Sequence, residues 1–202
     1  MVTQSTYDEL KNKYGTVASW TLWCPAEDTK KSNTENLSVF QNPDLLEKLN
    51  AKYVFVALNA ANHPNFQANP AWSCFHSGYR YQNDYKLRAA TQGTRFEGSY
   101  ITDIIKYYVE TDSSKVKSAI KKDPEIIENN LKYFREELEL LKSSNNEMNP
   151  VLIALGNDAY NLLNKHITGY TIKNVFNLRG SFKIQAAMRS SVVIIINVFF
   201  YF

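Results

Sequence analysis

The chain has 202 residues, a formal net charge of +3, and 44% hydrophobic and 13% aromatic residues. This apolar content excludes an intrinsically disordered chain, and the length suits a single domain, residues 1–202, with a full core. The small positive excess permits a polyanionic partner without requiring one, because many unrelated soluble proteins carry a similar charge.

The cysteines and the N-terminus bear on the cellular compartment. Cys24 and Cys74 do not form a C-x-x-C pair, so the sequence favours neither a zinc site nor a disulfide framework. Residues 1–15, MVTQSTYDELKNKYG, lack the basic and then apolar order of a signal peptide. We therefore expect a cytoplasmic protein, and we expect it to be a monomer.

The first half of the chain predicts short helices over residues 6–14 and 42–52, followed by a strand. Residues 53–58 contain only aromatic, aliphatic and small side chains, as expected for a strand that is covered on both faces. Asn59 would then lie at the carboxyl end of this strand, where ligands bind in open α/β sheets. Residues 59–97 form an irregular, aromatic-rich segment, and a loop of that length in a compact domain is usually functional.

The second half predicts further strands and helices in alternation. Residues 99–109 are a strand candidate, and residues 123–146 have apolar side chains at helical spacing, with Asp123 before Pro124 as the start. Residues 150–166 give a strand, a glycine and an amphipathic helix. This alternation predicts an α/β fold with a small parallel sheet flanked by helices on both faces. The remaining expectations are an exposed helix face at 115–122 and short strands at 170–176 and 181–185.

The C-terminal residues 190–202, SSVVIIINVFFYF, are strongly apolar. Their continuous apolar part is far shorter than the ~20 residues that a membrane-spanning helix needs. The β-branched and aromatic residues favour a buried strand over a membrane anchor, and we expect no membrane partner. An altered end of the natural gene is a third interpretation, because a chain that finishes on an uncapped apolar run is prone to aggregate.

Four motifs occur in an order that resembles the uracil-DNA glycosylase superfamily. ALNAA at 57–61 is similar to its G-[IM]-N-P-G strand-end motif, and SCFHSG at 73–78 to its pocket-wall segment with a stacking phenylalanine. YITDIIK at 100–106 resembles the second strand motif, which ends in a base-reading asparagine, and VLIALGNDAYNLL at 151–163 the third strand and its helix. The resemblance implies a DNA-binding enzyme that flips out a nucleotide and cleaves its N-glycosidic bond without a metal or cofactor.

The resemblance gives Asn59 and Phe75 roles at the reacting base. Asn59 matches the residue that orients the attacking water, and its carbonyl can aim that water at C1′ as the sugar develops oxocarbenium character. The alternative is an asparagine that only satisfies a turn. Phe75 matches the aromatic that stacks on the extruded base, an interaction worth ~1–3 kcal/mol, although an ordinary core role is equally open.

Asp103 departs from the pattern, because uracil-specific members usually carry an asparagine at this position. An ionised aspartate can only accept hydrogen bonds, so it suits the exocyclic amine of cytosine better than the O4 acceptor of uracil. A protonated Asp103 would accommodate uracil, and a helix cap is the structural alternative. Ala61 matches a position where uracil-selective members with G-Q-D-P-Y carry a tyrosine that blocks C5, so a 5-substituted cytosine is favoured.

The histidine-containing loop with which the family stabilises the departing base is missing in recognisable form. His63 and His76 are candidates to approach the base from the first loop, and Gln185 could donate a neutral hydrogen bond. Met188 or Arg189 could fill the gap that the flipped base leaves. A packing or surface role is the more common one for each of these residues.

Cations interleaved with tyrosines in the long loop predict a phosphate track beside unstacked bases. The alternative is a solvated surface. The residues concerned are Arg80, Lys86, Arg88 and Arg95.

The sequence thus predicts a monofunctional DNA glycosylase whose favoured substrate is a 5-modified cytosine, such as the hydroxymethylated or glucosylated cytosine of phage DNA, with a role in antiphage defence. Two alternatives stay open. One is uracil excision in base excision repair, and the other is a non-catalytic relative that binds DNA or protein.

Overall fold

The computed structural model describes residues 1–59, 69–79 and 82–175. Several sequence predictions concern positions outside these ranges, and the structure does not test them. They are Ala61, His63, Arg80, Gln185, Met188 and Arg189, the strand at 181–185 and the C-terminal residues 190–202.

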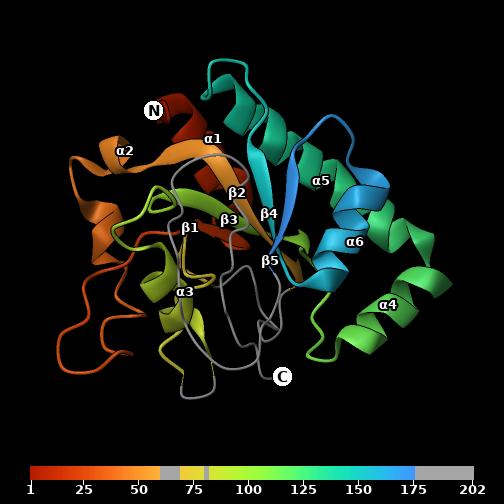
Figure 1. The fold of residues 1–202 in the computed structure, drawn as a ribbon, viewed down its shortest axis with the longest axis horizontal. Coiled ribbons are helices and arrows are strands. Elements are labelled where there is room, and N and C mark those ends of the chain that lie inside the picture. The colour runs from red at the N-terminus through yellow and green to blue at the C-terminus, as the bar shows by residue number, and fades with distance from the viewer. Residues whose placement is uncertain (60–68, 80–81, 176–202) are drawn as a thin grey trace, which may run out of the picture.

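The described residues form one mixed sheet with the strand order β1-β3-β2-β4-β5 (Figure 1). From β3 to β5 all neighbours pair in parallel, whereas β1 pairs with β3 antiparallel. The predicted α/β fold is confirmed at this level, and the antiparallel edge strand was not predicted. The strands are β1 Ala18–Trp20, β2 Asn50–Asn59, β3 Ser99–Ile105, β4 Val151–Leu155 and β5 Ile172–Val175.

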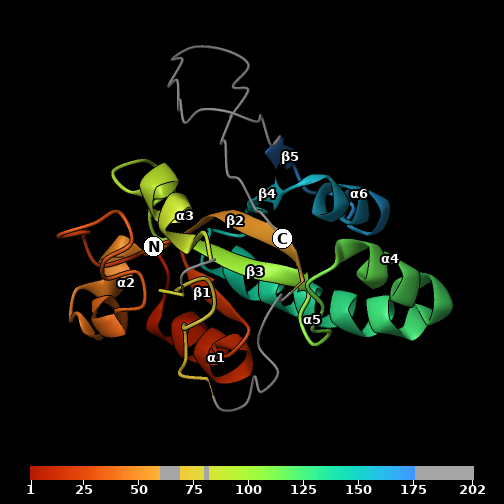
Figure 2. The ribbon, with the colours of Figure 1, turned by 90° about the horizontal axis from the view of Figure 1, so that it is seen from below.

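Helices cover both faces of the sheet (Figure 2). One face packs against α1, α5 and α6 through a large core cluster, and the other carries α3 over a smaller cluster that includes Phe55, Ile101 and Ile153. Across the described residues, no helix combines the length and the apolar character needed to cross a bilayer. The helices are α1 Gln4–Tyr14, the 3-10 helix η1 Leu37–Gln41, α2 Leu45–Lys48, α3 Asp84–Thr91, α4 Ser113–Lys122, α5 Pro124–Ser143 and α6 Asn157–His166.

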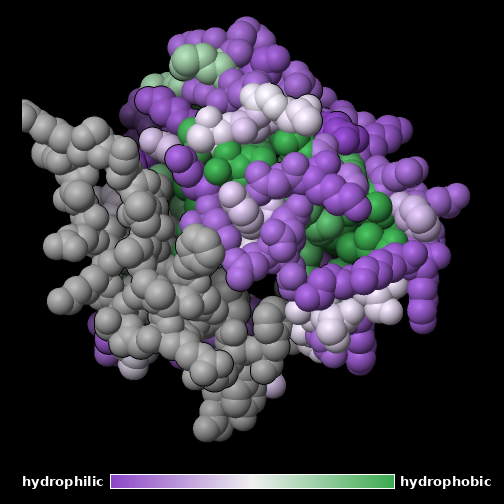
Figure 3. All heavy atoms as spheres, turned by 45° about the vertical axis from the view of Figure 1, so that its right-hand side comes forward, coloured by the Kyte–Doolittle hydropathy of each residue, from purple (hydrophilic) through white to green (hydrophobic). Residues whose placement is uncertain are grey.

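The longest helix follows its sequence signals closely. The Asp123 side chain accepts a hydrogen bond from the Glu125 backbone N–H, and Pro124 occupies the first turn, where its missing donor costs nothing. The adjacent α4 is amphipathic and buries Val116, so its lysines lie on an exposed face, as predicted. Figure 3 shows that hydrophilic residues dominate the side of the molecule that it views, with hydrophobic residues in separate areas.

Two predicted elements differ from the structure because long-range contacts determine their bounds. Only a four-residue α2 forms within the helix predicted at 42–52, because Asn50 already pairs with Ser99 in the sheet. The strand predicted over 99–109 ends at Ile105, where the Lys106 backbone N–H leaves the sheet and donates to Asn130 of α5 at 2.7 Å.

Candidate functional site

The sheet brings Asn59 and Asp103 to the same edge. Strands β2 and β3 are parallel neighbours, and Ala57 pairs with Asp103 while Asn59 pairs with Ile105. Side chains alternate across a strand, and Ala57 and Ile101 pack in the cluster under α3, so Ala57 and Asp103 belong to that face of the sheet. The two candidate residues therefore lie at adjacent carboxyl ends, which is where an open α/β sheet places its ligand site.

Asp103 is a buried carboxyl with an unusual environment. The residue is 4% exposed, and its Oδ1 atom has no hydrogen-bond partner among the residues that the structure describes. Burial raises the pKa of Asp103 to about 7; the Lys106 ammonium opposes this, whereas Glu137 and Asp84 add to it. Near neutral pH the group can thus serve as an acceptor in its ionised form or as a donor in its neutral form.

We expect Asp103→Asn to stabilise the protein in a pH-dependent way. The folded state holds the Asp103 proton more tightly than the unfolded chain, so the wild type loses stability as the pH rises from about 4 through about 7. The neutral amide avoids this loss, and urea unfolding should show a gain of about 2–4 kcal/mol at pH 8 and almost none at pH 4. An equal difference at both pH values would contradict a raised pKa for Asp103.

Asn59 is fixed at the strand end by its own amide group. Its Nδ2 atom donates to the backbone carbonyl of Glu110 at 2.7 Å and to that of Tyr108 at 3.3 Å. These contacts tie β2 to the loop that follows β3, and they are long-range instead of the local turn bonds that the alternative interpretation describes. They also set the orientation of the amide plane.

Phe75 lies on the same side of the sheet as Asp103. It is half-buried against the cluster under α3, and its carbonyl accepts a hydrogen bond from Trp23 Nε1 at 3.3 Å. Its φ angle is 63°, in the left-handed region that a non-glycine residue rarely adopts. Backbone strain of this kind is concentrated at ligand sites, because the surrounding structure must maintain it.

Both ring nitrogens of His76 are engaged by backbone carbonyls, which argues against the base-binding role that the sequence predicted. His76 is 3% exposed, its Nε2 lies 2.9 Å from the Leu22 carbonyl, and its Nδ1 lies 3.0 Å from the Cys74 carbonyl. Burial lowers the pKa of His76 and favours the neutral ring. Its ring also stacks on Trp23, at a centroid distance of 4.9 Å. His76 therefore anchors the segment that carries Phe75.

Arg88 is also corrected, because its guanidinium faces the interior instead of a phosphate track. It is 2% exposed and donates to the backbone carbonyls of Cys24, Lys30 and Ser32 at 2.7–3.0 Å. The other two described cations of the predicted track differ from it. Lys86 is half-buried near the Tyr85 ring, and Arg95 is exposed over Phe96.

We expect Arg88→Met to destabilise the protein by about 2–3 kcal/mol, because three backbone acceptors of the 24–32 loop would lose a charged donor. The matched variant Arg95→Met removes an exposed guanidinium and should cost less than ~1 kcal/mol. Denaturant unfolding monitored by tryptophan fluorescence measures both. Equal losses would show that the carbonyl contacts of Arg88 contribute little.

Asp84 is a site component that sequence reasoning missed. It is 8% exposed, lies in the first turn of α3, and accepts a hydrogen bond from the Ser77 N–H at 2.8 Å. Burial raises the pKa of Asp84 to about 6. Cys74 lies near both aspartates, and burial raises the pKa of its thiol to about 12, so this cysteine is no nucleophile at neutral pH. An acidic residue in a first helical turn was the only sequence signal for Asp84.

The comparisons with known proteins add no relative, since no family model, curated protein or solved structure matches the chain. No group of metal-ligating side chains occurs among the described residues. An open pocket bordered by Trp23, Pro43, Lys48 and Glu97 lies toward the amino ends of β2 and β3, away from Asn59 and Asp103.

Proposed function

We propose that this protein is a DNA glycosylase that flips a base toward the carboxyl edge of β2 and β3 and prefers a cytosine derivative to uracil. The observation that carries this proposal is the Asp103 carboxyl, which is buried at the edge where ligands bind and has an oxygen without a partner among the described residues. A buried polar atom without a partner costs free energy, so its retention favours a ligand that supplies the missing hydrogen.

The exocyclic amine of cytosine supplies that hydrogen to an ionised carboxylate. Phe75, held in a strained conformation on the same side of the sheet, would stack on the base, and Asn59 would position the water that attacks C1′. The ionised state of Asp103 is already substantial at neutral pH, since its pKa is about 7. Removal of modified cytosines from phage DNA, as part of a defence response, is the role that fits this preference.

A strand-cleavage assay tests the proposal. The protein is incubated with duplexes that contain uracil, cytosine, 5-hydroxymethylcytosine or its glucosylated form, and alkali then cuts the chain at each abasic site. Strand breaks on a modified-cytosine duplex are the expected result, and Asn59→Ala should bind that duplex but cut it at least ~10²-fold more slowly. Binding without breaks on any duplex would exclude the glycosylase.

A non-catalytic role in DNA binding is the second candidate, and the position of His76 favours it. Glycosylases of the resembled family stabilise the departing base with a histidine, and His76 is occupied by backbone carbonyls instead. The same assay separates the two functions, because a binding protein would retain the duplex in a gel and leave every base in place.

A further inference from the structure

Lys106 is a fully buried lysine directly after β3, one residue beyond the strand that carries Asp103. Its ammonium group lies 2.6 Å from Glu137 Oε2, 2.6 Å from the Asp103 carbonyl oxygen and 2.8 Å from Thr102 Oγ1. The ammonium donates hydrogen bonds to the Asp103 carbonyl and to Thr102 Oγ1, and its contact with Glu137 is an ion pair. The Phe134 ring lies 5.3 Å from the same nitrogen. The charge is thus held in one place.

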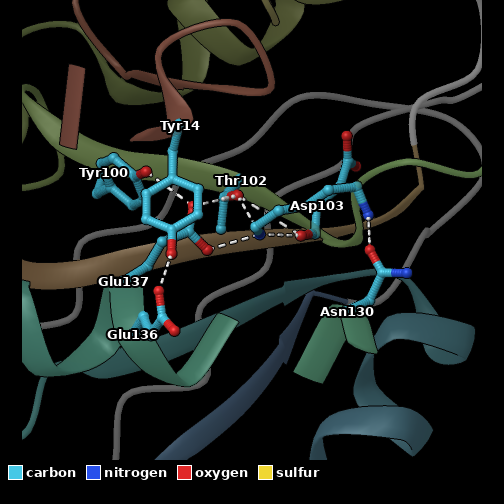
Figure 4. A network of polar contacts seen from close by, with 8 residues as sticks. Tyr14, Tyr100, Thr102, Asp103, Asn130, Glu136 and Glu137 are labelled. Carbon is cyan, nitrogen blue, oxygen red and sulfur yellow. Dashed lines mark hydrogen bonds and ion pairs between the residues drawn. The ribbon is translucent and has the colours of Figure 1, made fainter. Parts of the chain in front are cut away.

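The network around Lys106 is anchored on helix α5 (Figure 4). Glu137 is fully buried and accepts hydrogen bonds from Tyr100 at 2.8 Å and from Thr102 at 3.0 Å. The Lys106 backbone N–H is bound by Asn130, which in turn donates to the Ile126 carbonyl. Lys106, the first residue after β3, is therefore held through both its backbone N–H and its side chain.

A buried ion pair is by itself weak evidence that the arrangement serves the stability of the fold. Removing two charges from water is so costly that a buried ion pair can often be replaced by apolar residues without loss of stability. The lysine also bonds the carbonyl of the residue whose side chain faces the candidate site. Figure 4 shows the Asp103 carboxylate pointing away from Glu137 and Thr102, toward the opposite side of the strand.

We propose that Lys106 is a positioning residue for Asp103. The ion pair with Glu137 holds Lys106 beneath the sheet, and its hydrogen bond to the Asp103 carbonyl fixes the direction in which the Asp103 carboxylate points at the base-reading edge. The proposal rests on the proposed function in that Asp103 reads a base. The charged and titratable groups that interact electrostatically with Asp103 are Lys106 after β3, Glu137 on α5, Asp84 on α3, and the Cys74 thiol.

The test compares the full-length wild type with Lys106→Met/Glu137→Gln, which removes both buried charges together. Lys117→Met/Asp158→Asn is the matched control, because it removes an exposed pair that is 3.2 Å apart. Carbon NMR of the aspartate carboxyl groups reports the titration of Asp103 directly, with Asp103→Asn to assign its signal. Strand cleavage reports the preference for modified cytosine over uracil.

In the buried-pair variant, the titration midpoint of Asp103 should rise, since Lys106 opposes the effect of burial more than Glu137 adds to it. The preference for modified cytosine should fall about tenfold. Lys106→Gln/Glu137→Gln retains a donor for the Asp103 carbonyl and should restore most of the preference. This second variant also keeps the proposal testable if the methionine variant does not fold. The control should match the wild type in both measurements.

An unchanged midpoint and an unchanged preference in a folded buried-pair variant would overturn the proposal. A wild type that cuts no duplex would refute the glycosylase function separately. The positioning role would then be decided by comparing the Asp103 titration in the methionine and glutamine variants, which remove the same charges and differ in the donor to the Asp103 carbonyl. Equal effects of the methionine and glutamine variants would show that the hydrogen bond to the Asp103 carbonyl does not matter.

Discussion

Replacing Asp103 with asparagine is expected to reverse the base preference of the protein. In the proposed glycosylase, the ionised carboxylate would accept a hydrogen from the cytosine amine but would face the uracil O4 acceptor with a second acceptor. An asparagine amide could instead donate to O4. Each mismatched polar group in a buried site costs ~1–3 kcal/mol. The rate ratio of modified cytosine to uracil should therefore change by about 10²-fold in the strand-cleavage assay.

The base preference measured in this assay is also expected to depend on pH, in a direction that the pKa of Asp103 defines. Because the pKa of Asp103 is raised to about 7, the carboxylate predominates above that pH and the neutral carboxyl below it. The wild-type preference for cytosine should rise as the pH passes through 7, and the asparagine variant should show no such dependence. Asp84→Asn removes the neighbouring buried carboxyl and should retain the cytosine preference. A wild type and Asp103→Asn with the same preference at every pH would remove Asp103 from base reading.

The largest loss of stability is expected for Glu137→Gln. The substitution keeps an acceptor for Tyr100 and Thr102 but leaves the fully buried Lys106 ammonium without a counter-charge. Breaking one side of a buried ion pair costs about 3–5 kcal/mol, because the remaining charge stays desolvated. Urea unfolding at neutral pH should show a loss of this size in the free energy of unfolding.

The control for this loss is Asp158→Asn, which breaks the exposed contact with Lys117 and should change stability by less than ~1 kcal/mol. Adding Lys106→Met to Glu137→Gln should recover most of the lost stability, since no unpaired charge then remains. If the double variant is as unstable as Glu137→Gln alone, the loss comes from packing and not from the charge.

The strand ends were predictable because they depend on local patterns. The apolar run ending at Asn59 predicted the carboxyl end of β2, and the run before Asp103 placed that residue within β3. Parallel pairing of the two strands then brings their ends together. The structure of the surrounding loop segments was harder to predict from the sequence. Helix α3 lies in a segment that was expected to be irregular, and its Asp84 was missed.

Residue type alone did not decide the roles of His76 and Arg88. A histidine and an arginine in an aromatic-rich loop favour ligand and phosphate contacts, but burial commits both side chains to backbone carbonyls. The sequence also offered no reason to connect Lys106 with Glu137, because the two residues are 31 positions apart in the chain. Contacts of this kind form only when helix and sheet pack together.

The amino-acid sequence by itself determined the α/β class, the main strands, the capped start of α5 and the presence of a carboxylate where the resembled family carries an amide. Those features follow from hydrophobic period, helix capping and side-chain chemistry, all of which act over a few residues. Only the tertiary structure decided the protonation of Asp103 and the placement of the charge beneath it. Both depend on desolvation by distant segments, because the free energy of a charge is set by everything that excludes water from it.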